Sequence, residues 1–316
     1  MPSTAIFLPL LIEGTDQAHL DRHIPMRFPK QVRVTNFPFR YLVVAPERTV
    51  GLIRILKNAS TELTTAFGCT EWMPVEEFTG TPVCFLRDPV DRLLSAIPET
   101  LLRIREPLPF RRHTHSVVYA NADIYLSLQR AARQSMDSLV DTYCDVLRHG
   151  FFDAHHAPQW HFLADWSGEP FCDPHVYRVE ELASGVEDVT KRFGVPARTT
   201  SRYNSGDDRW RGQSALRQRL KQFLGRSSHL DPVDPDHPLL LLLAASGLKT
   251  AETPAAPTRR TLMDAASALY PLLKSLKSNV RVEIIIDELY SIDRALHQAA
   301  ATAPIGTRLA ALTHLG

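Results

Sequence analysis

The stretch Pro82-Val83-Cys84-Phe85-Leu86-Arg87-Asp88-Pro89 decides the fold class, because it passes from a fully apolar run straight into a helix start. A short apolar run without alternation is typical of a strand buried on both faces, as in a parallel sheet. Asp88 suits the N-cap and Pro89 the first turn of a helix. Apolar residues keep helical spacing to Ile97, and Pro98 predicts the end of this helix.

The same order of strand, polar corner and helix occurs elsewhere in the chain. The apolar segment Val50–Leu56 leads into Lys57-Asn58-Ala59-Ser60-Thr61 and then into a predicted helix that stops at Gly68. Two further strands are predicted at Tyr41–Ala45 and Pro174–Val179. Strands that alternate with helices predict an α/β fold, with a central parallel sheet flanked by helices. In such sheets ligands bind at the carboxyl ends of the strands, where both corners lie.

Composition excludes several classes of protein. The 316 residues carry a net charge of +1, so no global field attracts nucleic acid. The four cysteines form no CxxC pair, and we expect no metal. The apolar runs Ala5–Ile12 and Leu239–Ala245 are too short to span a bilayer, so we expect a cytoplasmic protein without a transmembrane segment.

The chain is expected to divide into an α/β domain and a helical extension. We place the α/β domain at residues 1–249, a linker rich in proline and alanine at 250–258, and C-terminal helices at 259–316. These helices are expected to pack on the core or to form an interface, which would make a homodimer.

Both corners carry groups that suit a phosphate. The Lys57–Thr61 loop offers backbone N–H groups, the mobile charge of Lys57, and the hydroxyls of Ser60 and Thr61. It lacks the GxxxxGK[ST] pattern, which argues against an ordinary ATP or GTP loop. The alternative for the isolated loop is a helix cap beside a surface lysine.

Arg87 gives the second corner a bidentate donor that is always charged. Ser95 follows about two helical turns later, and Arg92 is either a second donor or a solvated charge. The alternative is a buried structural pair of Arg87 with an aspartate. Taken together, corners about 26 residues apart predict a grip on two separate phosphates of one nucleotide, which acts as a group donor.

These motifs resemble those of sulfotransferases that use 3′-phosphoadenosine-5′-phosphosulfate (PAPS), especially the carbohydrate, Golgi-type and bacterial branch. Arg87-Asp88-Pro89-x-x-Arg92-Leu93-Leu94-Ser95 is similar to the 3′-phosphate motif, and Lys57–Thr61 to the 5′-phosphosulfate loop. Weaker similarities follow in the family's order to about residue 205: Asp153-Ala154-His155-His156-Ala157-Pro158-Gln159, Tyr177-Arg178-Val179-Glu180-Glu181-Leu182 and Asn204-Ser205. The chain beyond about residue 206 does not match closely, although Asp287-Glu288-Leu289-Tyr290-x-x-Asp293 resembles a helix near the end of such proteins.

The resemblance implies a P-loop-like three-layer fold and a metal-free transfer of a sulfuryl group from PAPS, leaving PAP, to an acceptor hydroxyl on a carbohydrate or glycolipid. Lys57 would stabilise the leaving group. The residues implied to bind the nucleotide are Lys57, Asn58, Ala59, Ser60, Thr61, Arg87, Arg92 and Ser95.

The general base has three candidates. His155 matches the family's histidine, His156 competes with it, and Glu62 departs from the family pattern but lies beside the loop. The segment 98–117, with His113 and His115, is expected to contact the acceptor. Two other functions stay open: a nucleotide-dependent phosphotransferase, and an inactive nucleotide-binding or assembly module of the same fold.

Overall fold

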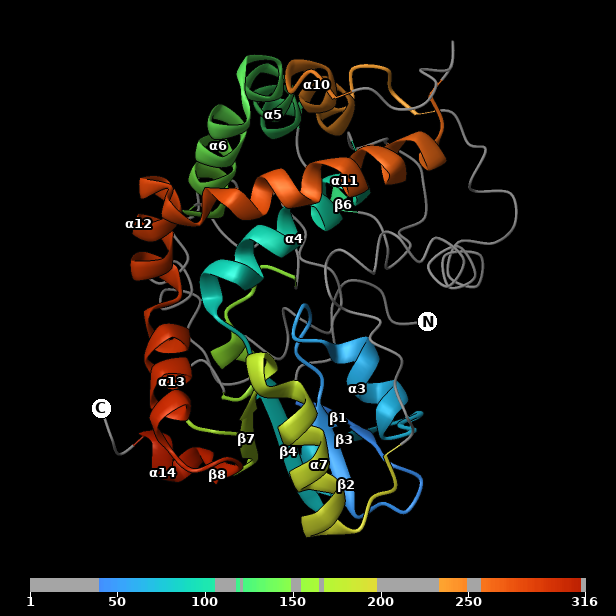
Figure 1. Cartoon of the computed structure of the whole chain (residues 1–316), viewed down its shortest axis with the longest axis vertical. Helices are drawn as coiled ribbons and strands as arrows, with labels where there is room; N and C mark the ends of the chain where they lie inside the picture. The colour runs from blue at the N-terminus through green and yellow to red at the C-terminus, as the bar shows by residue number, and fades with distance from the viewer. Residues whose placement is uncertain are drawn as a thin grey trace.

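The structure is a computed structural model that describes residues 40–105, 118–119, 122–148, 155–164, 168–197, 233–248 and 257–313. A sheet with helices on both faces occupies one end of the molecule, and a group of helices occupies the other (Figure 1). The predictions for Ala5–Ile12, for His113 and His115, and for Asn204-Ser205 concern residues outside the described ranges.

The main sheet has six strands in the order β3-β1-β2-β4-β7-β8. Their bounds are β1 Tyr41–Val44, β2 Val50–Ile53, β3 Glu71–Pro74, β4 Thr81–Leu86, β7 His175–Arg178 and β8 Thr307–Arg308. The central strands β2, β4 and β7 are parallel, whereas β1, β3 and β8 join antiparallel at the edges. The prediction of a central parallel sheet is confirmed for β2, β4 and β7, and the sheet as a whole is mixed. Residues 45–49 form a tight turn from β1 to β2, which makes this pair antiparallel, whereas β3 and β8 reach their partners after long intervening segments.

The parallel strands explain why their corners meet. Val83 of β4 lies opposite His175 of β7, and Leu52 of β2 lies opposite Val83. The carboxyl ends of all three strands therefore share one edge of the sheet. Strand β2 ends at Ile53 rather than at Leu56, so the predicted corner loop starts earlier than the apolar pattern indicated.

Alternate strand residues face two different cores. One face packs under helices α3, Ser60–Ala66, and α7, Leu182–Phe193, and contributes Val43, Leu52, Val83, Phe85 and Tyr177. The other face packs under the short helix η2, Gln159–Phe162, and helices α13, Ser291–Thr302, and α14, Leu309–Thr313. It contributes Leu42, Val44, Ile53, Cys84, Leu86 and Val176. The sheet is thus the middle of three layers.

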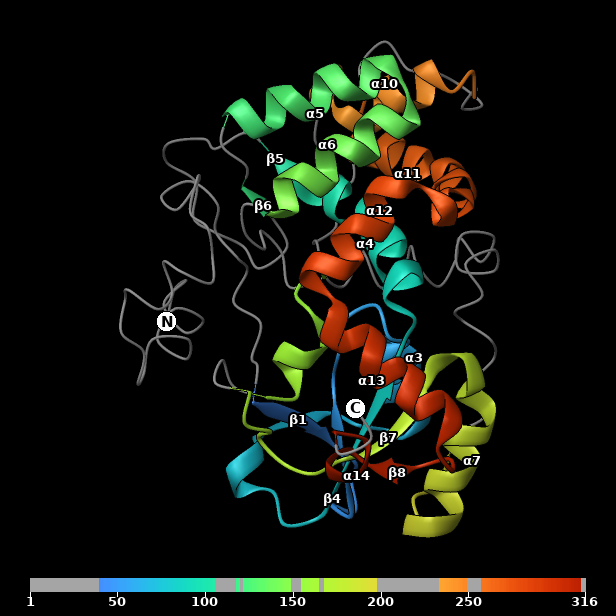
Figure 2. The ribbon, with the colours of Figure 1, turned by 90° about the vertical axis from the view of Figure 1, so that its left-hand side faces the viewer.

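Helix α4, Pro89–Arg103, runs from the sheet into the helical group (Figures 1 and 2). The prediction that Pro98 ends it is wrong. Ile97 and Leu101 are fully buried on the same core, so continued packing outweighs the hydrogen bond that proline removes. The other helices of this group are α5 Ala122–Gln134, α6 Met136–Arg148, α10 Pro238–Ala245, α11 Arg259–Lys274 and α12 Val280–Leu289.

The C-terminal helices pack on the rest of the chain. Helix α11 lies against α4 and α10, and α12 lies against α6. Helices α12 and α13 form a column that descends from the helical group to the sheet (Figure 2). A two-stranded parallel ladder, β5 Ile104–Arg105 with β6 Val118–Tyr119, completes the described strands. Within the described part, no helix combines the length and apolar character needed to cross a bilayer.

Candidate functional site

The loop between β2 and α3 has an unusual backbone. Lys57 and Ala59 adopt left-handed conformations, with φ of 68° and 54°, although neither is glycine. Such conformations are costly and occur where the surroundings impose them, often at functional sites. Left-handed residues that alternate with their neighbours turn successive N–H groups to one side, as in anion-binding loops. Within the described ranges the hydroxyls of Ser60 and Thr61 have no hydrogen-bond partner.

Arg87 joins the two corners. It follows β4, and its Nη1 donates to the carbonyl oxygen of Lys57 at 2.9 Å and to Oγ of Ser95 at 3.2 Å. Within the described ranges its Nε and Nη2 donate to no protein group, and the side chain is half-buried. These two nitrogens form the edge of a guanidinium that binds an anion bidentately. Within the described ranges Arg87 pairs with no aspartate, so the alternative of a buried Arg–Asp pair is wrong.

The helix that follows Arg87 starts as predicted. Oδ1 of Asp88 accepts the N–H of Asp91 at 2.9 Å, and Pro89 occupies the first turn. Ser95 is 3% exposed, and its hydroxyl donates to the carbonyl of Arg92 at 2.8 Å while it accepts from Arg87. Ser95 thus orients the guanidinium of Arg87.

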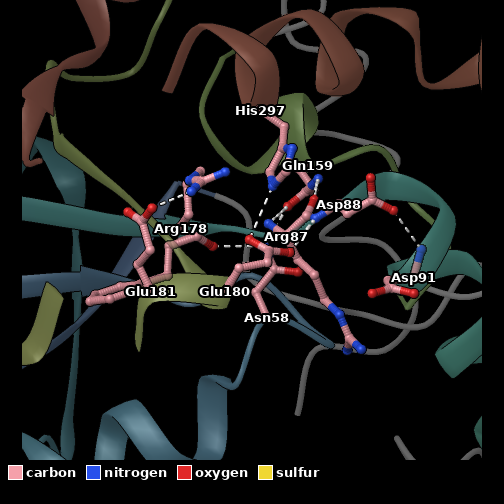
Figure 3. A network of polar contacts seen from close by, with 10 residues as sticks. Asn58, Arg87, Asp88, Asp91, Gln159, Arg178, Glu180, Glu181 and His297 are labelled. Carbon is pink, nitrogen blue, oxygen red and sulfur yellow. Dashed lines mark hydrogen bonds and ion pairs between the residues drawn. The ribbon is translucent and has the colours of Figure 1, made fainter. Parts of the chain in front are cut away.

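A buried amide network holds both corners from behind (Figure 3). The side-chain amide of Gln159 accepts the N–H of Arg87 at 2.9 Å and donates to its carbonyl at 2.8 Å, as a neighbouring strand would. Nδ2 of Asn58 donates to Oε1 of Gln159 and, at 2.7 Å, to the carbonyl of Phe85. Asn58 and Gln159 are 1% and 0% exposed, so Asn58 supports the loop from inside. In Figure 3 the side chain of Arg87 extends away from this network.

Two carboxylates lie beside the loop. Nζ of Lys57 donates to Oε2 of Glu99 at 3.2 Å, and the lysine side chain is 7% exposed. Glu99 is one helical turn after Ser95 on α4, and it belongs to none of the motifs in the sequence. Glu62 is in the first turn of α3 and is buried. Lys57 is thus a mostly buried, paired cation rather than a solvated surface lysine.

Arg92 lies inside the protein, at 1% exposure. Its Nε donates to the carbonyl of Leu56 at 3.0 Å and its Nη1 to the carbonyl of Ala157 at 2.8 Å, with Phe162 below the guanidinium. It therefore ties the loop before Lys57 to the segment before Gln159. The solvated-charge alternative for Arg92 is wrong.

The two candidate histidines lie in different environments. His156 is fully buried, and its Nε2 contacts Oγ1 of Thr100 at 2.6 Å and the hydroxyl of Tyr143. This places His156 in the helical core as a structural residue. His155 is half-buried and begins the described segment 155–164.

The corner after β7 lies at the same edge of the sheet and carries Glu180. Oε1 of Glu180 accepts the N–H of Asp88 at 3.0 Å, and Oε2 contacts Nε2 of His297 at 3.0 Å (Figure 3). Burial opposes ionisation of Glu180. The hydrogen bonds from His297 and from Asp88 outweigh burial and lower the pKa of Glu180 to about 2. Glu180 is therefore ionised at neutral pH, and it connects the corner after β7 to the corner after β4.

Metal ligands are not grouped in the part that the structure describes: no three His, Cys, Asp or Glu side chains there could hold one ion. Comparisons of the chain with protein-family models, with curated proteins and with solved structures find no match. A function for this chain is therefore inferred from the geometry of the two corners, Lys57–Thr61 and Arg87–Ser95.

Proposed function

We propose that this chain is a PAPS-dependent sulfotransferase of P-loop-like three-layer fold, which moves a sulfuryl group to a hydroxyl of a carbohydrate or glycolipid. The observation that carries the proposal is the position of Arg87. One guanidinium nitrogen fixes the Lys57 loop to Ser95, while Nε and Nη2 donate to no group in the described ranges. This arrangement combines a bidentate anion site with a lysine loop at one edge of the sheet.

The residues present fit a nucleotide with two separate phosphates. Arg87, oriented by Ser95, would hold the 3′-phosphate. The loop N–H groups with the hydroxyls of Ser60 and Thr61 would hold the 5′-phosphate. Asn58 and Arg92 do not face outward, and they support the site by fixing the loop.

Catalysis in this proposal depends on placement and charge. The S–O bond to the 5′-phosphate breaks, a new S–O bond to the acceptor oxygen forms, and the acceptor proton passes to a base. Lys57 stabilises the negative charge that grows on the leaving phosphate oxygen. His155 and Glu62 are the candidates for the base, since His156 is committed to Thr100 and Tyr143.

Binding of PAP tests the proposal directly. Saturating PAP is expected to raise the melting temperature of the wild type by several degrees, because a ligand that binds only the native state stabilises it. Arg87→Ala should weaken PAP binding at least about 30-fold, since it loses charge-assisted hydrogen bonds worth about 1.5–3 kcal/mol each. Titration calorimetry gives the affinity.

Arg48→Ala is the matched control. Arg48 is an exposed arginine that binds the carboxylate of Glu71, and it lies before β2 at the opposite end of the strands. It should leave PAP binding unchanged. A wild type that shows no shift with millimolar PAP contradicts the proposal. Binding without transfer to any acceptor favours the inactive binding module.

Glu99 gives a prediction with the opposite sign. Its carboxylate is close to the Lys57 ammonium and therefore to the bound phosphates. Glu99→Gln should tighten PAP binding about 3- to 10-fold at low salt, because it removes a like charge from an anion site. The gain should shrink as ionic strength rises, which calorimetry at two salt concentrations measures. Weaker binding by Glu99→Gln would place the phosphates away from Lys57.

A further inference from the structure

The junction of α12 and α13 grips the segment around Gln159 at two points. The hydroxyl of Tyr290 donates to the carbonyl of His156 at 2.6 Å. The carboxylate of Asp293 accepts the N–H of Gln159 at 2.6 Å and that of Trp160 at 2.8 Å. Both gripping side chains are buried, at 2% and 1% exposure. Helices from the end of the chain thus fix a segment more than a hundred residues earlier.

Burying the carboxylate of Asp293 to accept these two N–H groups costs solvation free energy. Burial raises the pKa of Asp293 to about 6, although the charge of Arg92 and the two backbone N–H groups act in the other direction. A buried carboxylate stabilises a fold only when its hydrogen bonds and counter-charge offset the lost solvation. Packing alone therefore does not explain an aspartate here. Its specific effect is to cap helix η2 and to set where Gln159 lies.

Gln159 transmits that position to the site. Its amide pairs with both backbone groups of Arg87 and accepts from Asn58. Gln159 is fully buried and contacts both Arg87 and Asn58. A displacement of η2 therefore moves both of these residues together.

We propose that Asp293 is a positioning residue for the nucleotide site. By capping η2 it holds the Gln159 amide, and through that amide it holds Arg87 and Asn58 at the spacing that the two phosphates require. This inference rests on the proposed function, because the spacing matters only to a ligand that contacts both corners.

A double-mutant cycle tests the proposal. Asp293→Asn keeps the shape but turns an amide NH2 toward one of the two N–H donors. Gln159→Leu removes the contacts with Arg87 and leaves the backbone cap. Each should raise the Kd for PAP about 10-fold, and the double variant should raise it about 10- to 30-fold rather than the about 100-fold expected for independent sites. Calorimetry is done on folded protein, well below each melting temperature.

The outcomes separate the two proposals. If wild type does not bind PAP, the proposed function fails. If wild type binds and Asp293→Asn binds equally well, or if the two changes multiply fully, the positioning role fails alone. Asp287→Asn is the control, because Asp287 forms an exposed ion pair with Arg294 nearby and should change nothing. Should Asp293→Asn not fold, Asp293→Glu, which keeps the charge and shifts the cap, replaces it with the same expectation.

Discussion

Lys57→Ala is expected to lower kcat for sulfuryl transfer about 100- to 1000-fold while it raises the Kd for PAP less than about 10-fold. The reason is that the ammonium meets more negative charge on the leaving oxygen in the transition state than in the bound nucleotide. Its loss should therefore affect the chemical step more than binding. Alanine keeps a Cβ at the left-handed position, so backbone strain is the same in both proteins.

The measurement is single-turnover transfer from PAPS, beside calorimetry with PAP. Lys191→Ala is the matched control, because Lys191 also pairs with a glutamate, Glu187, but on the exposed face of α7. It should retain full activity. If Lys57→Ala transfers at the wild-type rate, Lys57 is not the leaving-group stabiliser, and the pair with Glu99 is only structural. A weaker PAP affinity with an unchanged kcat would instead mean that Lys57 acts by uniform binding.

Both corners could be predicted from sequence because their signals are local. An apolar run before Arg87 marks a strand end, and Asp88 with Pro89 marks a helix start; the structure confirms the Asp88 cap. Lys57 was selected for the same reason. The two corners lie next to each other because β2 pairs parallel with β4, which places the carboxyl ends of both strands at one edge of the sheet.

The supports of the site could not be predicted, because their partners are distant in sequence. Gln159 ends one of the sequence motifs, but its pairing with Arg87 spans 72 residues and its contact with Asp293 spans 134. No periodicity marks a polar residue as buried when the element that covers it comes from elsewhere. Glu99 could not be predicted for a related reason. Pro98 predicts the end of the helix, whereas α4 continues to Arg103 and its next turn places Glu99 beside Lys57.

The short edge strands show a further limit. Strand β3 is half-exposed and contains Trp72 and Pro74, and β8 has two residues. Strands this short carry too few residues to show alternation, so only their pairing in three dimensions identifies them. Strands β3 and β8 were therefore not predicted, whereas β1, which also pairs antiparallel, was predicted from its apolar run.

Arg92→Met is expected to lower the free energy of unfolding by about 3–5 kcal/mol, because it removes two buried hydrogen bonds and the positive charge that favours ionised Asp293. The change leaves the carbonyls of Leu56 and Ala157 without their donor, and each such loss costs about 1–3 kcal/mol. It also removes the positive charge that lowers the pKa of Asp293, so that carboxylate becomes harder to keep ionised. Urea unfolding gives the free energy, with an unchanged slope expected.

Arg130→Met is the control for Arg92, because Arg130 lies exposed on α5, where it donates to the hydroxyl of Ser127. It should cost less than about 0.5 kcal/mol. A loss below about 1 kcal/mol in Arg92→Met would show that water replaces the guanidinium, and the site would not depend on it. The expected large loss has a functional consequence, since Leu56 precedes Lys57 and Ala157 precedes the Gln159 helix. Arg92→Met that still folds should therefore bind PAP more weakly than wild type without having lost any direct ligand contact.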